Sequence, residues 1–402
     1  VVLIDLHGDL FRRTAAWAIS AGVQNLLLLD FTRPDLLPSW NPLAPAPGVD
    51  PGRQVDHLVG VLRRITASDQ ASAWAWGPKT EEIFRYGLRA AIESPIPCTL
   101  VDLPAFLAIP HLRARLAASA SSDTRSYFQQ QFTRRDEGYV SSVTNRLQPL
   151  VQSIAAQRFL GVPDGTLDLP SFLDGGGTIL VNLSKGYLGP GAEMLGRLLV
   201  NFIELTAFRR HDTPLAKRKP FSLLLDEAHG LTGSDSGFEN LLIGGRKFGV
   251  SVTLASQSLS LFPADARTIL LGNTALHWIF RLPHADARQL APDLLEPLGS
   301  VQRQRVRPYD SLEDPLLTPS EEIAARTREL SNLPVGACYW HCRGKDFRGR
   351  RLQLDPPSVL PISEGRLDRE IDSAMARFRS TVGTNERPAP RAPLRESPAK
   401  SN

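Results

Sequence analysis

The chain has 402 residues, of which 42% are hydrophobic, so it can bury a large core and form about two or three domains. Its 46 basic and 42 acidic residues leave a net charge of +4, which permits nucleic-acid binding without requiring it. Three cysteines exclude a disulfide framework, and no apolar run is long enough to cross a membrane as a helix. Because no signal peptide is visible either, we expect the chain in the cytoplasm.

Residues 1–50 begin with the pattern of an α/β domain. VVLI at the start predicts a buried strand, and a polar turn containing Gly8 connects it to a helix over Phe11 to Ser20. NLLLLDF, Asn25 to Phe31, predicts a second buried strand, and the proline-rich segment after it breaks regular structure. These residues are therefore expected to form the first part of a parallel-sheet domain.

Residues 51–170 have a different character. Apolar residues recur at helical spacing and strand patterns are scarce, which predicts an all-helical domain inserted into the sheet domain. The aromatic side chains of this segment are expected to pack its core and not to stack on bases: Trp74, Trp76, Phe84, Tyr127 and Phe128.

The strand pattern returns over residues 171–300. Thr178 to Leu183 reads as a fully buried strand, and a long amphipathic helix follows it. Further strands are expected over Val250 to Ala255 and over Thr274 to Leu282. This segment is expected to complete the α/β domain.

The pattern weakens beyond residue 300. Residues 301–360 predict a β extension with a hairpin around Gly344, and residues 361–402 predict a helix and then, from about Thr384, a disordered tail. Three side chains in CYWHC lack the second ligand pair of a zinc site and are interpreted as strand residues: Cys338, His341 and Cys342.

An apolar run that ends in two carboxylates occupies Phe221 to Gly230, FSLLLDEAHG. The run predicts a strand buried on both faces of a parallel sheet, whose carboxyl edge is where α/β folds bind ligands. This is the pattern of a Walker B strand, in which Asp226 would hold Mg²⁺, usually through water, and Glu227 would orient the attacking water. Alternatively, the two acidic residues only cap the next helix.

Other predicted strands supply side chains for the same chemistry. Asp5 ends the first strand, Gln257 follows the strand that ends at Ala255, and Arg246 precedes that strand. Phosphoryl transfer to water needs a metal ligand, a water-orienting carboxylate, a γ-phosphate sensor and often an arginine from a neighbouring subunit. The chain contains a candidate residue type for each role.

Seven ordered blocks between Val1 and about Leu290 resemble the HerA/FtsK-type P-loop ATPases, specifically the DNA-binding ATPase domain of type IV secretion coupling proteins. The blocks are VVLIDLHGDL, WNPLAP, WGPKTEEIFRYGLRAAIE, GGGTILVNLSKGYLG, PFSLLLDEAHGL, GRKFGVSVTLASQSLS and GNTALHWIFRL. The resemblance implies a RecA-like α/β fold with an inserted all-helical domain. It also implies ATP and Mg²⁺ as cofactors and a hexameric ring that moves DNA through its centre by hydrolysing ATP.

The resemblance assigns roles by motif. Asp226 resembles the Mg²⁺-associated Walker B residue, and Glu227 resembles the residue that activates water. Gln257 matches the polar sensor at the end of the next strand. Asp5 matches the acidic residue that ends the strand after the P-loop helix.

The family pattern assigns the roles of the two arginine candidates, Arg246 and Arg281, less directly. Arg246 stands where the family places an arginine that acts on a neighbouring subunit, and Lys247 competes for that role. Arg281, at the end of the last predicted strand, would contact the nucleotide or a neighbour, or form a structural ion pair.

The sequence departs from the family in one respect: GxxxxGK[ST] does not occur in it. In the family this P-loop precedes the strand that corresponds here to Val1 to Asp5, so a truncated N-terminus explains the gap. The backbone N–H groups and the Lys that hold phosphates would lie in the missing part. Family members of the coupling type also carry N-terminal membrane helices, so membrane association through that part stays open.

The implied partners are DNA of any sequence, further copies of the chain, and secretion or DNA-processing proteins. DNA binding by phosphate contacts should weaken steeply with salt. The basic candidates for these contacts are Arg63, Arg64, Arg134, Arg135, Lys217, Arg218, Lys219, Arg303, Arg305 and Arg307, each of which is also typical of a solvated surface.

Two competing interpretations remain. DLHGD resembles the first metal motif of metallophosphoesterases, but GNT at Gly272 departs from their next motif and no metal-spaced pair of histidines follows. The other is a catalytically degenerate scaffold or DNA-binding subunit, against which the retained Asp226, Glu227 and Gln257 argue.

Because the phosphate cradle is absent from these residues, the chain as given is expected to be inactive and to bind Mg-ATP weakly or not at all. Isothermal titration of the purified chain with Mg-ATP measures this. Tight binding by the chain alone would contradict the interpretation of its N-terminus.

Overall fold

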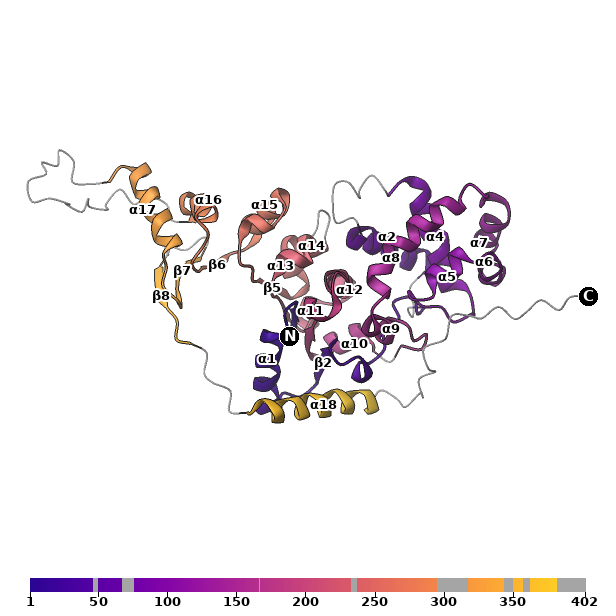
Figure 1. The fold of residues 1–402 in the computed structure, drawn as a ribbon, viewed down its shortest axis with the longest axis horizontal. Coiled ribbons are helices and arrows are strands. Elements are labelled where there is room, and N and C mark those ends of the chain that lie inside the picture. Colours follow the sequence, from indigo (N-terminus) through magenta and orange to yellow (C-terminus); the bar gives the residue numbers. More distant parts are fainter. Residues whose placement is uncertain are drawn as a thin grey trace, which may run out of the picture. The chain divides into compact units, whose positions relative to one another are not determined.

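The computed structural model describes residues 1–45, 50–66, 76–165, 167–232, 237–294, 317–342, 350–356 and 362–381. The chain divides into two compact units (Figure 1). The first contains Val1–Ala255 and the C-terminal helix, and the second is Ser256–Val359. The second unit thus contains residues 256–300, which the sequence assigned to the α/β domain.

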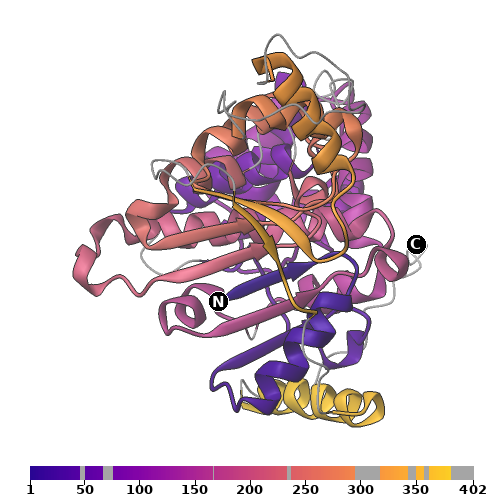
Figure 2. The same cartoon turned by 90° about the vertical axis from the view of Figure 1, so that its left-hand side faces the viewer.

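The first unit is built on a parallel sheet of five strands in the order β2-β3-β1-β4-β5 (Figure 2). The strands are β1 (Val2–Asp5), β2 (Leu26–Asp30), β3 (Thr178–Asn182), β4 (Phe221–Leu225) and β5 (Val250–Leu254). Each coincides with an expected strand, so the predicted α/β fold with a parallel central sheet is confirmed.

The strands are buried to different extents. All four residues of β1 are buried, as are four of the five in β2 and in β3, which fits their unbroken runs of Val, Leu and Ile. In β4, however, Ser222 and Leu224 are half-buried while Leu223 and Leu225 are buried. The expectation that this strand is buried on both faces is therefore wrong for one face.

Parallel strands need long crossover connections, which are usually helical, and the chain provides them. α1 (Asp9–Ser20) connects β1 to β2 and packs on β1 and β3. Its start needs Gly8, whose φ of 98° is unfavourable for other residues, and a Cβ there would lie 2.8 Å from Asn182 Oδ1. The turn into α1 is thus fixed by sterics.

Between β2 and β3 the described residues contain helices and no strand, which confirms the helical insertion. They are η1 (Pro34–Leu36), α2 (Pro51–Thr66), α4 (Pro78–Glu93), α5 (Leu103–Ala108), α6 (Pro110–Ala118), α7 (Ser122–Ser126), η2 (Tyr127–Gln131), α8 (Glu137–Val151), α9 (Ile154–Leu160) and α10 (Leu169–Asp174). Trp76, Phe84 and Tyr127 are buried in this segment and Phe128 is half-buried, as expected for a helical core; Trp74 lies outside the described residues.

Apart from the C-terminal helix, the remaining helical elements described in the first unit lie between β3 and β5. They are α11 (Lys185–Leu188), α12 (Gly191–Phe208), η3 (Arg209–Asp212), η4 (Leu215–Lys217), α13 (Ala228–Leu231), α14 (Gly237–Gly244) and η5 (Gly245–Phe248). The long helix α12 contacts α2 and α8 of the insertion as well as α14. It therefore joins the helical insertion to the sheet side of the unit.

A buried polar cluster lies on α12. Glu204 Oε2 is 3.1 Å from Arg64 Nη1 of α2, and Asn240 Nδ2 of α14 donates to Glu204 Oε1 at 2.7 Å. Burial raises the pKa of Glu204, and its partners oppose that shift. The half-buried Arg64 is thus engaged by Glu204, and its contact with DNA stays a prediction.

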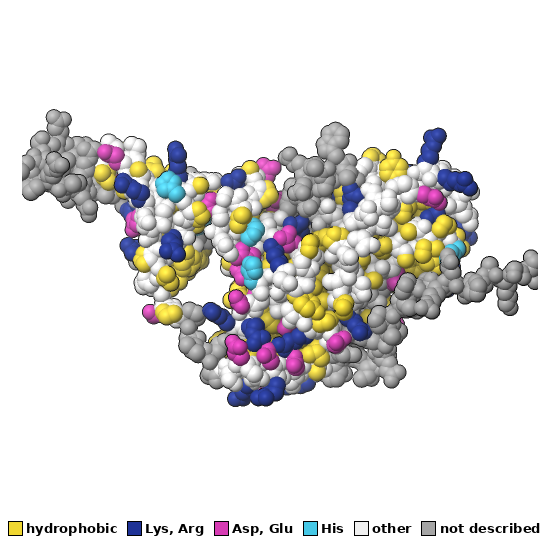
Figure 3. Space-filling model, in the orientation of Figure 1, with side chains coloured by type: hydrophobic (Ala, Val, Ile, Leu, Met, Phe, Trp, Pro, Cys, Tyr) yellow, Lys and Arg dark blue, Asp and Glu magenta, His cyan; other side chains and the backbone are white. Residues whose placement is uncertain are grey.

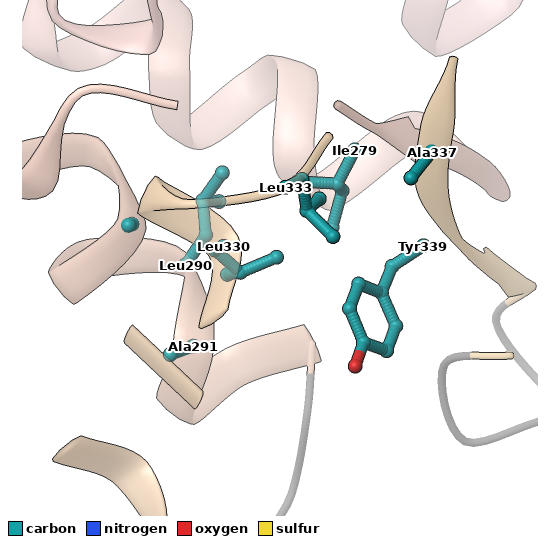
Figure 4. Close-up of a cluster of buried hydrophobic side chains, with 8 residues drawn as sticks. Ile279, Leu290, Ala291, Leu330, Leu333, Ala337 and Tyr339 are labelled. Atoms are coloured by element: carbon teal, nitrogen blue, oxygen red, sulfur yellow. The ribbon is translucent and has the colours of Figure 1, made fainter. Parts of the chain in front are cut away.

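The second unit contains a three-stranded antiparallel sheet in the order β6-β7-β8. Its elements are η6 (Leu259–Leu261), α15 (Ala264–Asn273), β6 (Leu276–Ile279), α16 (His284–Leu294), α17 (Pro319–Ser331), β7 (Ala337–Cys342) and β8 (Arg350–Gln353). Ile279, Leu290, Leu330 and Tyr339 lie in a hydrophobic cluster that joins this sheet to its helices (Figure 4). This cluster is the core of the unit.

Two strand predictions fall in this unit. The strand expected over Thr274 to Leu282 is present as β6, but it pairs antiparallel with β7 and is not a strand of the parallel sheet. The expected C-terminal hairpin is confirmed as β7 and β8, with Cys338, His341 and Cys342 in β7. Gly344, Arg303, Arg305, Arg307 and the tail from Thr384 lie outside the described residues.

The C-terminal helix α18 (Glu364–Thr381) packs against β2 and α1, more than 330 residues away in sequence (Figure 1). Asp368 Oδ1 accepts from Arg12 Nη1 at 2.8 Å and from Arg33 Nη2 at 2.6 Å, and Arg33 Nη1 donates to Asp372 Oδ1 at 2.6 Å. Figure 3 shows basic and acidic side chains gathered over α18 and its surroundings. Among the described residues no helix is long and apolar enough to span a membrane.

The position of α18 is expected to depend on Asp368. The two arginines hold the pKa of this carboxyl below its usual range, so its contribution is present at neutral pH and is lost as pH falls through the lowered pKa. Asp368→Asn should weaken helix docking by about 0.5–1 kcal/mol. Hydrogen exchange of residues 364–381 at pH 7 should then be faster than in the wild type.

Glu370→Gln is the matched control on the same helix, because the ion pair that Glu370 makes within the described residues is a long contact of 4.0 Å with the exposed Arg366. Its exchange should match the wild type. Equal exchange in both variants would show that the ion pairs do not hold α18.

Candidate functional site

Acidic side chains meet where the central strands end. Asp5 is the last residue of β1, and Asp226 and Glu227 follow β4 directly. The two strands are paired in parallel, and the Asp226 N–H donates to Ile4 O at 2.9 Å. The sheet therefore brings the carboxylate of Asp5 close to those of Asp226 and Glu227, which lie about 220 residues later in the sequence.

Asp5 is fully buried, and its carboxylate is engaged by the backbone. Oδ1 accepts from the His7 N–H at 2.7 Å and Oδ2 accepts from the Phe11 N–H at 2.8 Å. These bonds fix the turn that leads from β1 into α1. The contact of Asp5 with a cofactor stays a prediction.

Glu227 has a backbone conformation that is rare outside glycine, with φ 50° and ψ 47°. Such conformations cost about 1–3 kcal/mol and occur preferentially at functional sites. Its side chain is 9% exposed, and it makes no capping hydrogen bond to α13, although the residue occupies the N-cap position. If the acidic pair served only to cap the next helix, the Glu227 side chain would be expected to accept a hydrogen bond from that helix. It does not, which argues against the capping alternative at Glu227.

Two histidines flank the Glu227 carboxylate, and the sequence did not identify them as its neighbours. His229 Nδ1 lies 3.3 Å from Oε2, and His7 Nε2 lies 3.8 Å from Oε1. The sequence contains a signal for both, because each histidine follows the end of a predicted strand closely: His7 is two residues after Asp5, and His229 is four residues after Leu225. Strand pairing alone would have placed them at one edge.

Asp226 is half-buried among like charges. Burial raises its pKa most, the Asp5 carboxylate raises it further, and Glu227 adds to this, while a backbone hydrogen bond and the charge of His7 oppose the shift. A divalent cation would offset this repulsion, and carboxylate oxygens are the ligands that Mg²⁺ prefers. Asp226 thus fits the expected metal role, although no group of three or more His, Cys, Asp or Glu side chains in the described part of the chain is arranged as a metal site.

The turn after Glu227 is closely packed. Arg197 Nε donates to Gly230 O at 3.1 Å, and Lys185 Nζ and Arg197 Nη2 contact Glu193 at 2.7 Å and 3.3 Å. A Cβ on Gly230 would lie 2.8 Å from Leu6 Cδ1. The conformation of this turn is therefore determined by its surroundings.

The arginine and glutamine candidates lie elsewhere. Arg246 is exposed in η5, before β5, and so stands at the amino edge of the parallel sheet. A five-residue strand, roughly 16 Å long, separates that edge from Glu227. Gln257 and Arg281 belong to the second unit, where both are exposed. Their proposed roles stay predictions.

We expect Asp226→Asn to raise the thermal stability of the protein at pH 7. A raised pKa means that the folded state disfavours the charged carboxylate, so the cost of Asp226 is present once pH rises through the folded pKa and vanishes below the unfolded one. Thermal unfolding at pH 7 and near pH 3.5 should show a higher Tm for the variant only at pH 7.

Asp164→Asn provides the control, since Asp164 is exposed in a loop. A Tm at pH 7 that falls in Asp226→Asn, or that rises equally in both variants, would contradict the cost of the half-buried, charged Asp226 carboxylate.

No protein-family model matches the sequence, and no curated protein matches it either. Solved structures resemble the fold over most of its length, among them two of TrwB and one of VirB4. The unbound bacterial conjugative coupling protein TrwBdeltaN70 is 16% identical, with 90% of this chain and 80% of that chain covered and a TM-score of 0.56. TrwB in complex with ADP and Mg²⁺ is 13% identical, with coverages of 90% and 87% and a TM-score of 0.54.

VirB4 of Thermoanaerobacter pseudethanolicus is 11% identical, with 92% of this chain and 83% of that chain covered and a TM-score of 0.53. At identities this low, the structural similarity establishes the architecture of the chain but not its activity. The chain has the RecA-like α/β fold of the conjugative coupling protein TrwB and of VirB4.

Proposed function

We propose that this chain is the ATPase part of a motor of the conjugative coupling-protein or HerA type, which hydrolyses ATP to move DNA. The observation that carries the proposal is the position of Asp226 and Glu227 at the carboxyl edge of a parallel sheet with the fold of TrwB. Ligands bind at this edge in open α/β folds.

ATP and Mg²⁺ are the proposed cofactors. Structures of TrwB were solved with ADP and Mg²⁺ and with a non-hydrolysable ATP analogue. In this chain the half-buried Asp226 would hold the metal, because its like-charged neighbours favour a bound cation there. Bound Mg²⁺ would neutralise charge on the phosphates during transfer.

Glu227 is proposed to orient the attacking water. Its carboxylate is buried and flanked by His7 and His229, so it has few alternative orientations. A fixed carboxylate can accept a hydrogen bond from water and hold it in line with the reacting phosphorus. Gln257 is proposed as the polar sensor and Asp5 as a supporting residue that shapes the turn beside the phosphates.

Arg246 is proposed to act on the site of a neighbouring subunit. Because it stands at the opposite edge of the sheet from Glu227, it cannot reach the nucleotide of its own subunit without rearrangement. An arginine supplied by the next subunit requires a closed assembly, for which a homo-hexameric ring is the family arrangement. Arg281 is proposed to contact the nucleotide or that neighbour.

DNA is proposed as a sequence-independent partner. Arg134, Arg135, Lys217 and Lys219 are exposed on the first unit and are available for phosphate contacts. Such contacts release counterions, so binding should weaken with salt. We place the motor in the cytoplasm, where secretion or DNA-processing proteins would be further partners.

ATP turnover by the native protein tests the proposal through Glu227→Gln. The variant keeps the size of the side chain and removes its charge, so kcat with DNA present should fall by about 10²–10³ while the KM for ATP stays similar. Glu137→Gln, at an exposed carboxylate of the helical insertion, should turn over ATP like the wild type. Unchanged turnover in Glu227→Gln would refute the role of this carboxylate.

A further inference from the structure

We propose that Arg210 and Arg218 position Arg246 for its contact with the nucleotide of a neighbouring subunit. The inference rests on the proposed role of Arg246 and extends it to two residues that hold the backbone beside it. Neither Arg210 nor Arg218 is proposed to touch the nucleotide, so both are positioning residues.

Arg246 lies in the short segment η5, which ends at Phe248 and is followed by Gly249. The Arg246 side chain is exposed, and within the described residues it makes no ion pair with a carboxylate. A long, exposed side chain can meet an anion outside its own subunit only as accurately as its backbone is held. The hydrogen bonds that hold η5 therefore bear on what Arg246 can do.

Three consecutive carbonyls at the end of η5 accept hydrogen bonds. Carbonyls at the end of a helical segment have no partner within that segment and need donors from outside it. The carbonyls of Arg246, Lys247 and Phe248 accept from the Gly249 N–H at 3.2 Å, from Arg218 Nη1 and from Arg210 Nη1 at 3.2 Å, in that order. The two bonds from guanidinium groups are charge-assisted and therefore stronger than neutral ones.

Arg210 is buried, with 4% of its side chain exposed. Its Nε and Nη2 donate to Asp174 Oδ1 at 2.9 Å and 2.6 Å, and its Nη1 donates to Lys219 O at 2.9 Å as well as to Phe248 O. Because a guanidinium is planar and its N–H donors have fixed directions, these bonds determine where Phe248 O lies. Arg210 thereby ties the end of η5 to the residues that lead into β4.

Arg218 is half-buried and ties η5 to a second loop. Its Nε donates to Thr213 O at 2.7 Å and its Nη2 donates to His211 O at 3.2 Å, while Nη1 is bonded to Lys247 O. A lysine would keep the positive charge, but its single ammonium group cannot make three bonds in the plane of a guanidinium. Arg218→Lys therefore separates the hydrogen bonds from the charge.

The surface beside Arg246 suits an anionic partner. Lys247 in η5 is exposed, as are Lys217 and Lys219 in the segment that Arg210 and Arg218 tie to it. A nucleoside triphosphate at the carboxyl edge of a neighbouring copy is such an anion. Charge complementarity favours bringing these two surfaces together, and a held backbone lets Arg246 meet the transferring phosphate without reorganisation.

Steady-state ATP hydrolysis by the native protein, with DNA present, provides the first measurement. We expect kcat to fall about tenfold in Arg218→Lys with the KM for ATP unchanged, because an arginine from a neighbour stabilises the transition state. Arg246→Ala should lose at least as much. Full turnover in Arg218→Lys would overturn the proposal.

Arg209→Lys is the matched control. Arg209 is exposed in η3, and it makes no hydrogen bond with η5 in the part of the chain that the structure describes. Its turnover should match the wild type. A loss in Arg209→Lys equal to that in Arg218→Lys would overturn the assignment of the effect to the hydrogen bonds of Arg218.

Mixed assemblies distinguish an effect on the neighbour from a defect in the variant subunit itself. Arg218→Lys subunits keep Glu227, and Glu227→Gln subunits keep the bonds that hold Arg246. In an excess of Glu227→Gln subunits, turnover per Arg218→Lys subunit should return to within about threefold of that of wild-type subunits diluted in the same way. A tenfold deficit that persists in the mixture would place the defect in the subunit's own site and overturn the proposal.

Hydrogen exchange of the Gly249 amide provides a second measurement, which needs no turnover. This amide donates to Arg246 O, so its exchange rate reports how firmly the end of η5 is held. Loss of a charge-assisted bond should make exchange about tenfold faster in Arg218→Lys than in the wild type or in Arg209→Lys. Equal exchange in all three proteins would overturn the proposal.

The proposed function and this inference fail in different experiments. If Glu227→Gln loses turnover while Arg246→Ala or Arg218→Lys keeps it, the proposed catalytic carboxylate stands and only this inference fails. If Glu227→Gln keeps full turnover, the proposed function fails at its carboxylate, and the inference falls with it because Arg246 is proposed to complete that site.

Discussion

The parallel pairing of β1 with β4 is the constraint on which the rest of the site depends. Because these strands run in the same direction and in register, their last residues emerge at one edge, and the N–H of Asp226 is bonded to Ile4 O. Three carboxylates and two imidazoles from positions 5–7 and 226–229 are thereby brought together. A shift of either strand by one residue would separate them, since successive side chains point to opposite faces.

The crowded charges and the strained backbone at this edge both lower the stability of the folded state. Burial and the neighbouring carboxylates raise the pKa of Asp226, and Glu227 adopts a backbone conformation that an isolated chain would avoid. Both features cost folding free energy, which the buried core of β1 to β3 and the packed turn at Gly230 offset. Functional sites commonly retain features that locally destabilise the fold, because the arrangement of charged groups that a ligand requires differs from the arrangement that is most stable without it.

Much of the fold followed from local pattern. Short segments rich in Val, Leu and Ile predicted all five strands of the parallel sheet, and helical periodicity predicted the insertion, because each of these patterns is contained in a short stretch of sequence. The strand predicted over Thr274 to Leu282 is present as β6, but its partner is β7, which is more than 50 residues away in sequence. Pairing partners depend on long-range contacts that periodicity does not encode.

The sequence by itself determined the element types, the carboxylate pair after β4 and the resemblance to coupling-protein ATPases, because these depend on residue type and spacing along the chain. Only the tertiary structure decided that Arg64 is bound to Glu204, that Arg246 stands at the far edge of the sheet and that His7 and His229 flank Glu227. The reason is physical. A side chain's partners are set by strand order and helix packing, and the free energy of those contacts depends on distance and burial in three dimensions.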